Sequence, residues 1–175
     1  MHSYVIPPLL RGLSALSGLL TKAEAHCAEH SIKPEAILDF RLYPDMLTFT
    51  RQVQLTCDFA ARLPARLCVD EMPSFPDTEA SFAELQARIG KVKAYVEGYT
   101  PERLVGAETR SLILKQRAGE MTLTGLDMAT LYQRQFEKGL TYTINTWASA
   151  IGDDEVSMWN VYTGAAEAGL PYDSV

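Results

Sequence analysis

A stripe of apolar residues that recurs every three or four positions is the most constraining feature of this 175-residue sequence. The clearest stripe consists of Phe82, Leu85, Ile89, Val92 and Val96. Such spacing keeps one side of an α-helix apolar and directs that side toward neighbouring helices. Similar stripes can be drawn on three other long segments. The pattern therefore predicts an all-α fold in which four helices form a bundle around one core.

Prolines mark where the first two helices are expected to begin and end. Pro7 and Pro8 fit the first turn of a helix, where a missing N–H costs nothing, and this helix should run to about His30. Pro44 is expected to open the second helix, and Pro64 should kink or end it. The predicted stripes are Leu9, Leu13, Leu16, Leu20, Ala23 and Cys27 on the first helix, and Met46, Phe49, Val53, Cys57 and Ala60 on the second.

The second half of the chain combines helical and strand patterns. The third helix is expected from Ser81, which forms a capping-box pattern with Glu84, to Gly98. Alternating apolar residues over 112–123 predict a small β-hairpin. The fourth helix should follow over 126–150, and its stripe contains Leu126, Ala129, Gln133, Phe136, Leu140, Thr143, Trp147 and Ala150. Residues 156–168 predict a short C-terminal helix that ends before Gly169 and Pro171.

Length, charge and cysteine content narrow the class of protein. A chain of 175 residues suits one domain over 1–175. A net charge of −6 argues against the basic face of a nucleic-acid-binding protein. The apolar stretch 9–20 is interrupted by Arg11 and is too short to cross a bilayer. Three cysteines without a C-x-x-C pair fit a reducing compartment, so we expect a cytoplasmic protein.

Several sequence segments resemble an uncharacterised, domain-of-unknown-function branch of the DinB-like superfamily. They are Pro7-Pro8, Leu10–Leu13, Lys22–His26, Arg41–Met46, Thr50–Gln54 and Ser81–Ile89. The resemblance covers roughly the first 100 residues. It implies an up-and-down four-helix bundle with a short hairpin before the last long helix. Better-understood relatives in the superfamily hold a divalent metal with three histidines, and some act as thiol-dependent transferases or isomerases.

Beyond about Gly125 the sequence departs from that branch, which usually has a histidine-containing, aromatic-rich final helix. No residue after His30 is a histidine here. Gln133 and Tyr142 stand where those histidines would be expected from the resemblance. We therefore expect that the superfamily's metal triad is absent and that no metal cofactor is held.

The histidines of the first helix are the alternative metal ligands. His26 and His30 are four residues apart, so they share one side of the helix, with Glu29 nearby. One interpretation is a pair of solvated histidines that suit the negative end of the helix dipole. The alternative is a zinc or nickel centre completed by carboxylates, since a catalytic metal needs about three converging ligands.

The second helix carries the most prominent polar group, which contains Arg41, Asp45, Arg51, Gln54 and Asp58. Gln54 and Asp58 lie one turn apart on the same side. Helix capping and a solvated surface explain these residues in one interpretation. In the other, Gln54, Gln133 and Tyr142 converge at one end of the bundle and line a small polar pocket. The candidate ligand-binding residues are Asp45, Gln54, Asp58, Gln133 and Tyr142.

Three hypotheses for function remain open at this point. The favoured hypothesis is a bundle that binds a small ligand or a partner and lacks the metal triad. The second is a metal- and thiol-dependent transferase or isomerase. The third is a structural dimer without a ligand. Val156 and Trp159 on the last short helix would form an exposed apolar patch, and a homodimer would cover it.

Overall fold

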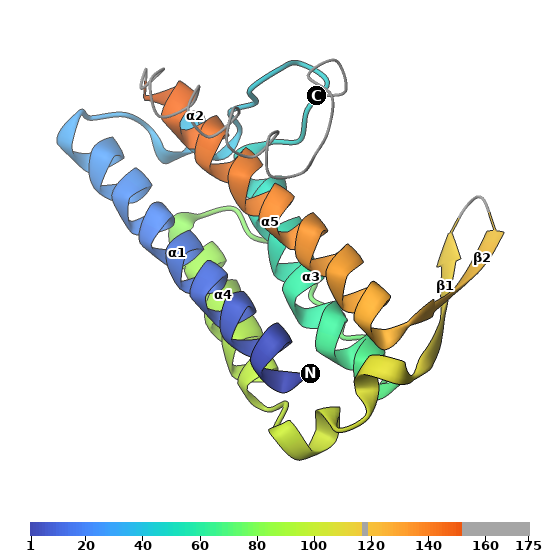
Figure 1. Cartoon of the computed structure of the whole chain (residues 1–175). Helices are drawn as coiled ribbons and strands as arrows, with labels where there is room; N and C mark the ends of the chain where they lie inside the picture. Colours follow the sequence, from blue (N-terminus) through green and yellow to red (C-terminus); the bar gives the residue numbers. More distant parts are fainter. Residues whose placement is uncertain (117–118, 152–175) are drawn as a thin grey trace.

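The computed structural model describes residues 1–116 and 119–151 and is mostly helical, with a small antiparallel hairpin (Figure 1). Its long helices are α1 (His2–Glu29), α3 (Phe49–Cys68), α4 (Phe82–Glu97) and α5 (Gly125–Ala150). The short elements are α2 (Pro34–Leu38), η1 (Pro101–Leu104), η2 (Ala107–Thr109), β1 (Ser111–Gln116) and β2 (Gly119–Thr124). The predicted hairpin before the last long helix is confirmed. The short helix predicted over 156–168 lies outside the described residues.

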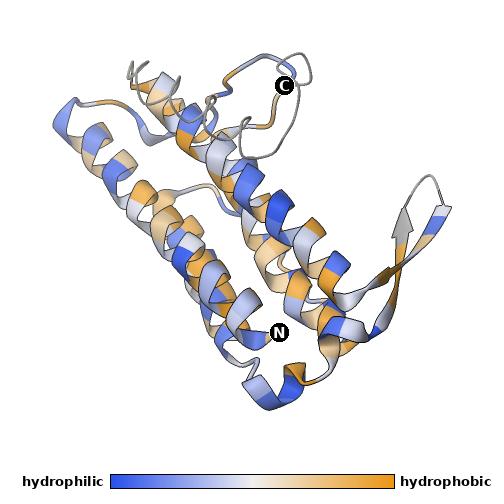
Figure 2. Cartoon of the chain, viewed as in Figure 1, coloured by the Kyte–Doolittle hydropathy of each residue, from blue (hydrophilic) through white to orange (hydrophobic). Residues whose placement is uncertain are grey.

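The predicted apolar stripes supply the core between the long helices. Every stripe residue predicted on the first helix is buried in α1, and all five from Phe82 to Val96 are buried in α4. Phe49, Val53, Cys57 and Ala60 of α3 are also buried. Figure 2 shows hydrophobic and hydrophilic residues alternating along each long helix, as expected for helices with one buried side.

Two consecutive long helices, α3 and α4, run in the same direction. Arg88 of α4 pairs with Asp58 of α3, and further along both segments Tyr99 contacts Asp70. The expected up-and-down order is therefore wrong at this step. The connection over 69–81 must return along the bundle, and its thirteen residues can span at most about 43 Å, more than the roughly 30 Å length of α3.

Two helices begin at other residues than the prolines predicted. Helix α1 begins at His2, so Pro7 and Pro8 lie inside it instead of opening it. Helix α3 begins at Phe49, because Thr48 is its N-cap: the Thr48 Oγ1 accepts a hydrogen bond from the Arg51 amide at 3.2 Å. Residues 39–48, including Pro44, precede the helix. The capping side chain of Thr48, and not Pro44, thus marks the first residue of α3.

Pro64 does not end α3, which continues to Cys68. The helix stops where Val69 adopts a left-handed conformation with φ of 60°. On α5, Leu126 was predicted to face the core but is 49% exposed. The neighbouring Gly125 and Met128 are buried in its place.

The hairpin follows strict antiparallel pairing. Leu112 lies opposite Leu123, Ile113 opposite Thr122, and Leu114 opposite Met121. Leu112 and Leu114 are buried, whereas Ile113 between them points to the other face and is exposed. In Figure 1 the hairpin extends away from the long helices, beside the start of α5.

Candidate functional site

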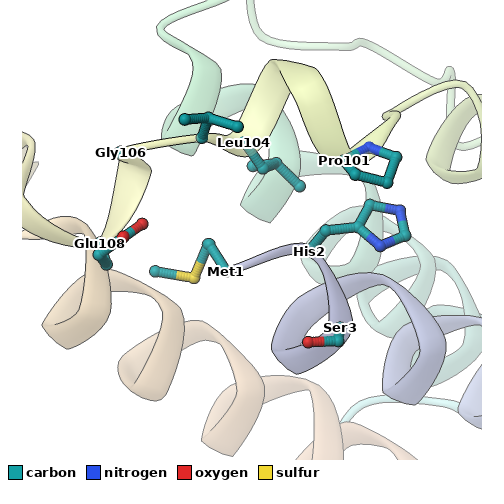
Figure 3. A pocket seen from close by; sticks show the side chains of 8 residues that line it. Met1, His2, Ser3, Pro101, Leu104, Gly106 and Glu108 are labelled. Carbon is teal, nitrogen blue, oxygen red and sulfur yellow. The ribbon is translucent and has the colours of Figure 1, made fainter.

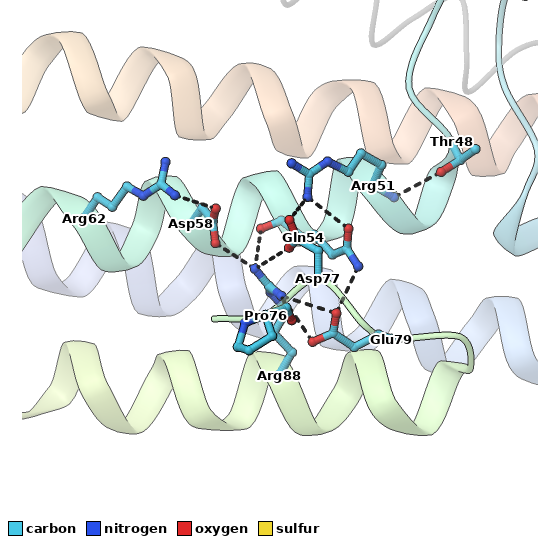
Figure 4. A network of polar contacts seen from close by, with 9 residues as sticks. All are labelled: Thr48, Arg51, Gln54, Asp58, Arg62, Pro76, Asp77, Glu79 and Arg88. Carbon is cyan, nitrogen blue, oxygen red and sulfur yellow. Dashed lines mark hydrogen bonds and ion pairs between the residues drawn. The ribbon is translucent and has the colours of Figure 1, made fainter. Parts of the chain in front are cut away.

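A closed network of charged side chains surrounds Arg88, whose side chain is only 1% exposed (Figure 4). The Arg88 Nη2 atom lies 2.7 Å from Asp58 Oδ1 and 3.1 Å from Asp77 Oδ1. Its Nη1 atom donates to both Glu79 carboxylate oxygens and to the Pro76 carbonyl oxygen, at 3.1 to 3.2 Å. Although burial lowers the pKa of Arg88, Glu79 and Asp58 raise it above its ordinary value. The guanidinium therefore stays charged.

Two further arginines complete the network. Arg51 pairs with Asp77 and donates to Gln54 Oε1, while Arg62 Nη2 lies 2.9 Å from Asp58 Oδ2. Three arginines thus face three carboxylates from Asp58, Asp77 and Glu79, so the network is formally neutral. Because Asp77 and Glu79 belong to the 69–81 connection, the network fastens that connection to α3 and α4.

The network contains two of the five candidate ligand-binding residues. Gln54 and Asp58 are both buried, and Gln54 Nε2 donates to Glu79 Oε2 at 2.9 Å. Neither residue belongs to a solvated helix surface. Sequence reasoning missed Arg88 as their shared partner. Arg88 follows Leu85 by three positions and precedes Val92 by four, so it lies on the same side of the helix as the apolar stripe. A charged residue on such a stripe is a signal of buried ion pairing.

The other three candidates lie elsewhere. Asp45 is exposed in the segment before α3. Gln133 donates from Nε2 to the Tyr4 carbonyl oxygen at 2.6 Å, and the Lys138 ammonium lies 5.6 Å from the Tyr142 ring centroid. Gln133 and Tyr142 are nine residues apart on α5, about 13 Å along its axis. Gln133 and Tyr142 thus each have a partner other than Gln54. The convergence of these two residues with Gln54 stays a prediction.

The contact between α3 and α5 contains a second group of buried polar side chains. Thr146 Oγ1 donates to Gln52 Oε1 at 2.9 Å, and Gln52 Nε2 donates to the Leu47 carbonyl oxygen at 2.8 Å. Thr56 and Thr143 bond to backbone carbonyls of their own helices. Asn145 is 1% exposed, and its Oδ1 has no hydrogen-bond partner among the described residues. Most polar groups of this contact thus satisfy one another or the backbone.

His26 and His30 meet at the end of α1. Their ring centroids are 4.2 Å apart and their planes are inclined by 29°. His30 Nδ1 lies 3.1 Å from the His26 carbonyl oxygen, so this nitrogen carries the hydrogen and donates. Within the described residues, no group of three or more His, Cys, Asp and Glu side chains is placed to hold a metal ion.

The cysteine thiols are free, and two of the three are buried. Burial raises the pKa of Cys57 to about 12, although Arg88 pulls it down. Cys68 is half-buried, and its pKa is also raised, chiefly by burial. The thiolate is the nucleophilic form, so both shifts oppose nucleophilic chemistry at neutral pH.

A depression of about 420 Å³ lies where the start of α1 meets η1 and η2 (Figure 3). It is lined by Met1, His2, Ser3, Pro101, Leu104, Val105, Gly106 and Glu108. Figure 3 shows that the polar side chains of His2, Ser3 and Glu108 lie apart from one another and do not converge on one point. Its wall thus lacks the few convergent polar groups typical of a small-molecule site.

Comparison with known families supplies the classification. The family model described as a domain of unknown function, DUF1993, matches residues 1–134. The chain belongs to the DUF1993 family. The matched region ends soon after Gly125. The sequence was expected to depart from the DinB-like branch near that residue. No curated protein matches the chain.

A solved structure supports the placement of DUF1993 among DinB-like proteins. The chain is similar to the crystal structure of a DinB family member protein from Shewanella denitrificans, with a TM-score of 0.74 and 27% sequence identity. The alignment covers 89% of this chain and 86% of the other. The resemblance to an uncharacterised DinB-like branch is thus confirmed. No helix in the described part of the chain has the length and apolar character needed to cross a membrane.

Proposed function

We propose that this DUF1993 protein is a binding protein, and that its hairpin end docks a second copy of the same chain. The observation that carries the proposal is the isolated position of the hairpin. Within the described residues its sheet contains only β1 and β2, so each strand has one edge without a strand beside it (Figure 1). The backbone groups of such an edge are a template for pairing with another strand.

The centre of β1 lacks the charges and prolines that usually prevent such pairing, and the one charged residue of the strand, Lys115, lies near its end. Its centre reads Leu112-Ile113-Leu114, with no charge and no proline. Ile113 is 58% exposed. Three more large apolar side chains are exposed in or near the hairpin: Met121 within β2, Val105 before the hairpin and Leu126 after it. Exposed apolar side chains at one end of a molecule favour a protein-binding role for that end.

The sequence of β1 suits pairing with itself. Antiparallel pairing of two β1 strands about Ile113 would place Ile113 opposite its own copy and Leu112 opposite Leu114 of the partner. Such an arrangement is two-fold symmetric, as the interface of a closed dimer requires. It would join two hairpins into a four-stranded sheet, which is more stable than an isolated pair of strands.

The wider proposal keeps the remaining sequence-based hypotheses. We propose one DinB-like four-helix bundle over 1–175, located in the cytoplasm. Small-ligand binding by Asp45, Gln54, Asp58, Gln133 and Tyr142 stays a prediction; Gln54 and Asp58 would have to leave the Arg88 network to reach a ligand. The alternative of a metal- and thiol-dependent transferase needs a third converging metal ligand, which the described residues do not supply beside His26 and His30.

The oligomeric state tests the proposal. Light scattering coupled to size exclusion should give the mass of a dimer for the full chain, and Ile113→Lys should give a monomer with unchanged helical circular dichroism. The matched control is Tyr43→Lys, because Tyr43 is similarly exposed, at 63%, but precedes α3 at the opposite end of the bundle. A monomeric wild-type chain, or a dimer that survives Ile113→Lys, would contradict the proposal.

A further inference from the structure

We infer that residues 71–80, part of the connection between α3 and α4, form a strap that leaves the bundle while the helices stay folded. Its departure opens a cationic site for a ligand that carries carboxylate groups. Opening of the strap is independent of the proposed hairpin interface. The ligand part rests on the proposed binding of a small molecule by Gln54 and Asp58, and the strap is the element whose movement frees Gln54.

The strap is held by side-chain contacts. Within the described residues, none of its backbone amides or carbonyls bonds to another backbone group. Arg88 reaches the Pro76 carbonyl oxygen and the Glu79 carboxylate, and the Phe75 ring meets the Tyr95 ring edge-on with centroids 6.3 Å apart. These contacts can break without loss of any backbone hydrogen bond of a helix. A segment attached in this way belongs to the low-stability end of a protein, where local opening precedes global unfolding.

The charges of the strap and of the site that it occupies are complementary. Residues 71–80 contain three acidic residues, Glu71, Asp77 and Glu79, and no Lys or Arg. Without the strap, the network keeps three arginines and one carboxylate, and hence a formal net charge of +2: Arg51, Arg62, Arg88 and Asp58. A site of this charge favours a dianion.

Asp77 and Glu79 occupy the positions that ligand carboxylates would take. Arg88 Nη1 donates to both Glu79 oxygens at 3.1 and 3.2 Å, and Gln54 Nε2 donates to Glu79 Oε2 at 2.9 Å. Asp77 is shared by Arg51 and Arg88. Figure 4 shows both acidic side chains pointing from the connection toward the arginines. Because the planar guanidinium fork matches a carboxylate, a ligand with two carboxylates would replace these contacts.

The two carboxylates of the strap differ in exposure, so opening begins at Asp77. The Asp77 and Arg51 side chains are 36% and 40% exposed, whereas Glu79 and Arg88 are 12% and 1% exposed. Exposed ion pairs contribute little to stability and are screened by salt. Substitution of Asp77 should therefore loosen the strap and leave its anchor at Glu79 in place.

Native-state proteolysis of the full chain tests the opening. Thermolysin cleaves before large apolar residues in unfolded segments, so it should cut before Phe75 when the strap leaves the bundle. The cleavage rate should depend little on urea, because opening exposes little surface. Asp77→Asn should raise this rate about fivefold with unchanged far-UV circular dichroism. The matched control, Asp45→Asn, removes an exposed carboxylate outside the network and should leave the rate unchanged. Cleavage with the urea dependence of global unfolding, or equal rates in both variants, would overturn the inference.

Carboxylate rescue tests the ligand. Asp77→Ala combined with Glu79→Ala empties both carboxylate positions, and millimolar sodium succinate should then raise the melting temperature in a saturable way, unlike sodium chloride at the same ionic strength. Asp77→Ala alone keeps Glu79 on Arg88 and should show a smaller rise. Wild type, whose own carboxylates fill the site, should respond to succinate no more than to chloride. Equal responses of wild type and both variants would overturn the carboxylate site, while proteolysis still decides the strap and light scattering the hairpin interface.

Discussion

Gln133 of α5 donates a hydrogen bond to a backbone carbonyl oxygen of α1 that Pro8 leaves without its usual donor. The carbonyl oxygen of Tyr4 would ordinarily accept a hydrogen bond from the residue four positions later, but Pro8 has no N–H. Gln133 Nε2 donates to this oxygen instead, at 2.6 Å. A side chain predicted to line a pocket thus completes the backbone hydrogen bonding of another helix.

Removing the Gln133 amide should destabilise the protein by about 1 kcal/mol, because the Tyr4 carbonyl then has no donor. We expect Gln133→Met to lower the free energy of unfolding in urea by this amount. In a Pro8→Ala background the restored N–H can bond to Tyr4, so the same substitution should cost much less. An equal cost in both backgrounds would show that the hydrogen bond is not what stabilises this contact.

The same pair of residues shows what the sequence could not reveal. The apolar stripe on residues 9–27 correctly identified the buried side of α1, because periodicity depends only on spacing. The expected start at Pro7 was wrong, because the N–H that Pro8 lacks is compensated by α5, which lies more than a hundred residues away. Helix boundaries that depend on tertiary partners leave no local signal.

The charged network shows a similar limit for the candidate site. The one-turn spacing of Gln54 and Asp58 correctly placed both on one side of a helix. Besides Arg51 and Arg62 of α3 itself, their partners come from a different helix and from the 69–81 connection, and these meet only because α3 and α4 are parallel. No spacing rule predicts that direction. The charge of Arg88 on an apolar stripe was the available signal.

Arg88→Met should be among the most destabilising single substitutions in this chain. It would leave Asp58, Asp77 and Glu79 clustered around one vacated cation position, and breaking a buried ion pair costs about 3–5 kcal/mol. Chemical denaturation measures the loss. The matched control is Arg62→Met, which removes the other arginine partner of Asp58. The Arg62 side chain is 40% exposed, so this ion pair lies near solvent. That exposed pair should contribute at most about 1 kcal/mol; similar losses for both arginines would contradict a central role for Arg88.

Glycines where helices meet should tolerate no side chain. A Cβ built on Gly139 would lie 2.5 Å from Thr56 Oγ1, and one on Gly125 would lie 1.8 Å from the Ala107 carbonyl oxygen. The second neighbour is backbone and cannot rotate away, so Gly125→Ala should cost roughly 1–3 kcal/mol or more. Thermal unfolding should show the lower melting temperature for Gly125→Ala than for Gly139→Ala.

The control for these glycines is Gly90, in the middle of α4, where an added Cβ meets nothing within 4 Å. Alanine has the higher helix propensity, so Gly90→Ala should stabilise the protein by about 0.5–1 kcal/mol. A loss of stability at Gly90 would contradict its placement on the solvent side of α4. The close contact with Thr56 explains why a glycine, Gly139, stands inside the last long helix.

Stability should fall in alkaline solution partly through Cys57. Burial raises the pKa of this thiol from its ordinary value of 9.0 to about 12, so between these values the unfolded chain ionises while the folded chain holds the proton. The contribution of Cys57 is therefore complete below pH 9 and is lost as pH rises toward 12, by up to about 1.4 kcal/mol per unit. Cys57→Ala removes the thiol that titrates. It also lowers the free energy of unfolding through lost packing, by an amount that does not depend on pH. Urea titrations measure the free energy of unfolding of wild type and of Cys57→Ala. The difference between the two proteins should consequently narrow from pH 8 to pH 11. A difference that does not change with pH would mean that the folded thiol ionises normally.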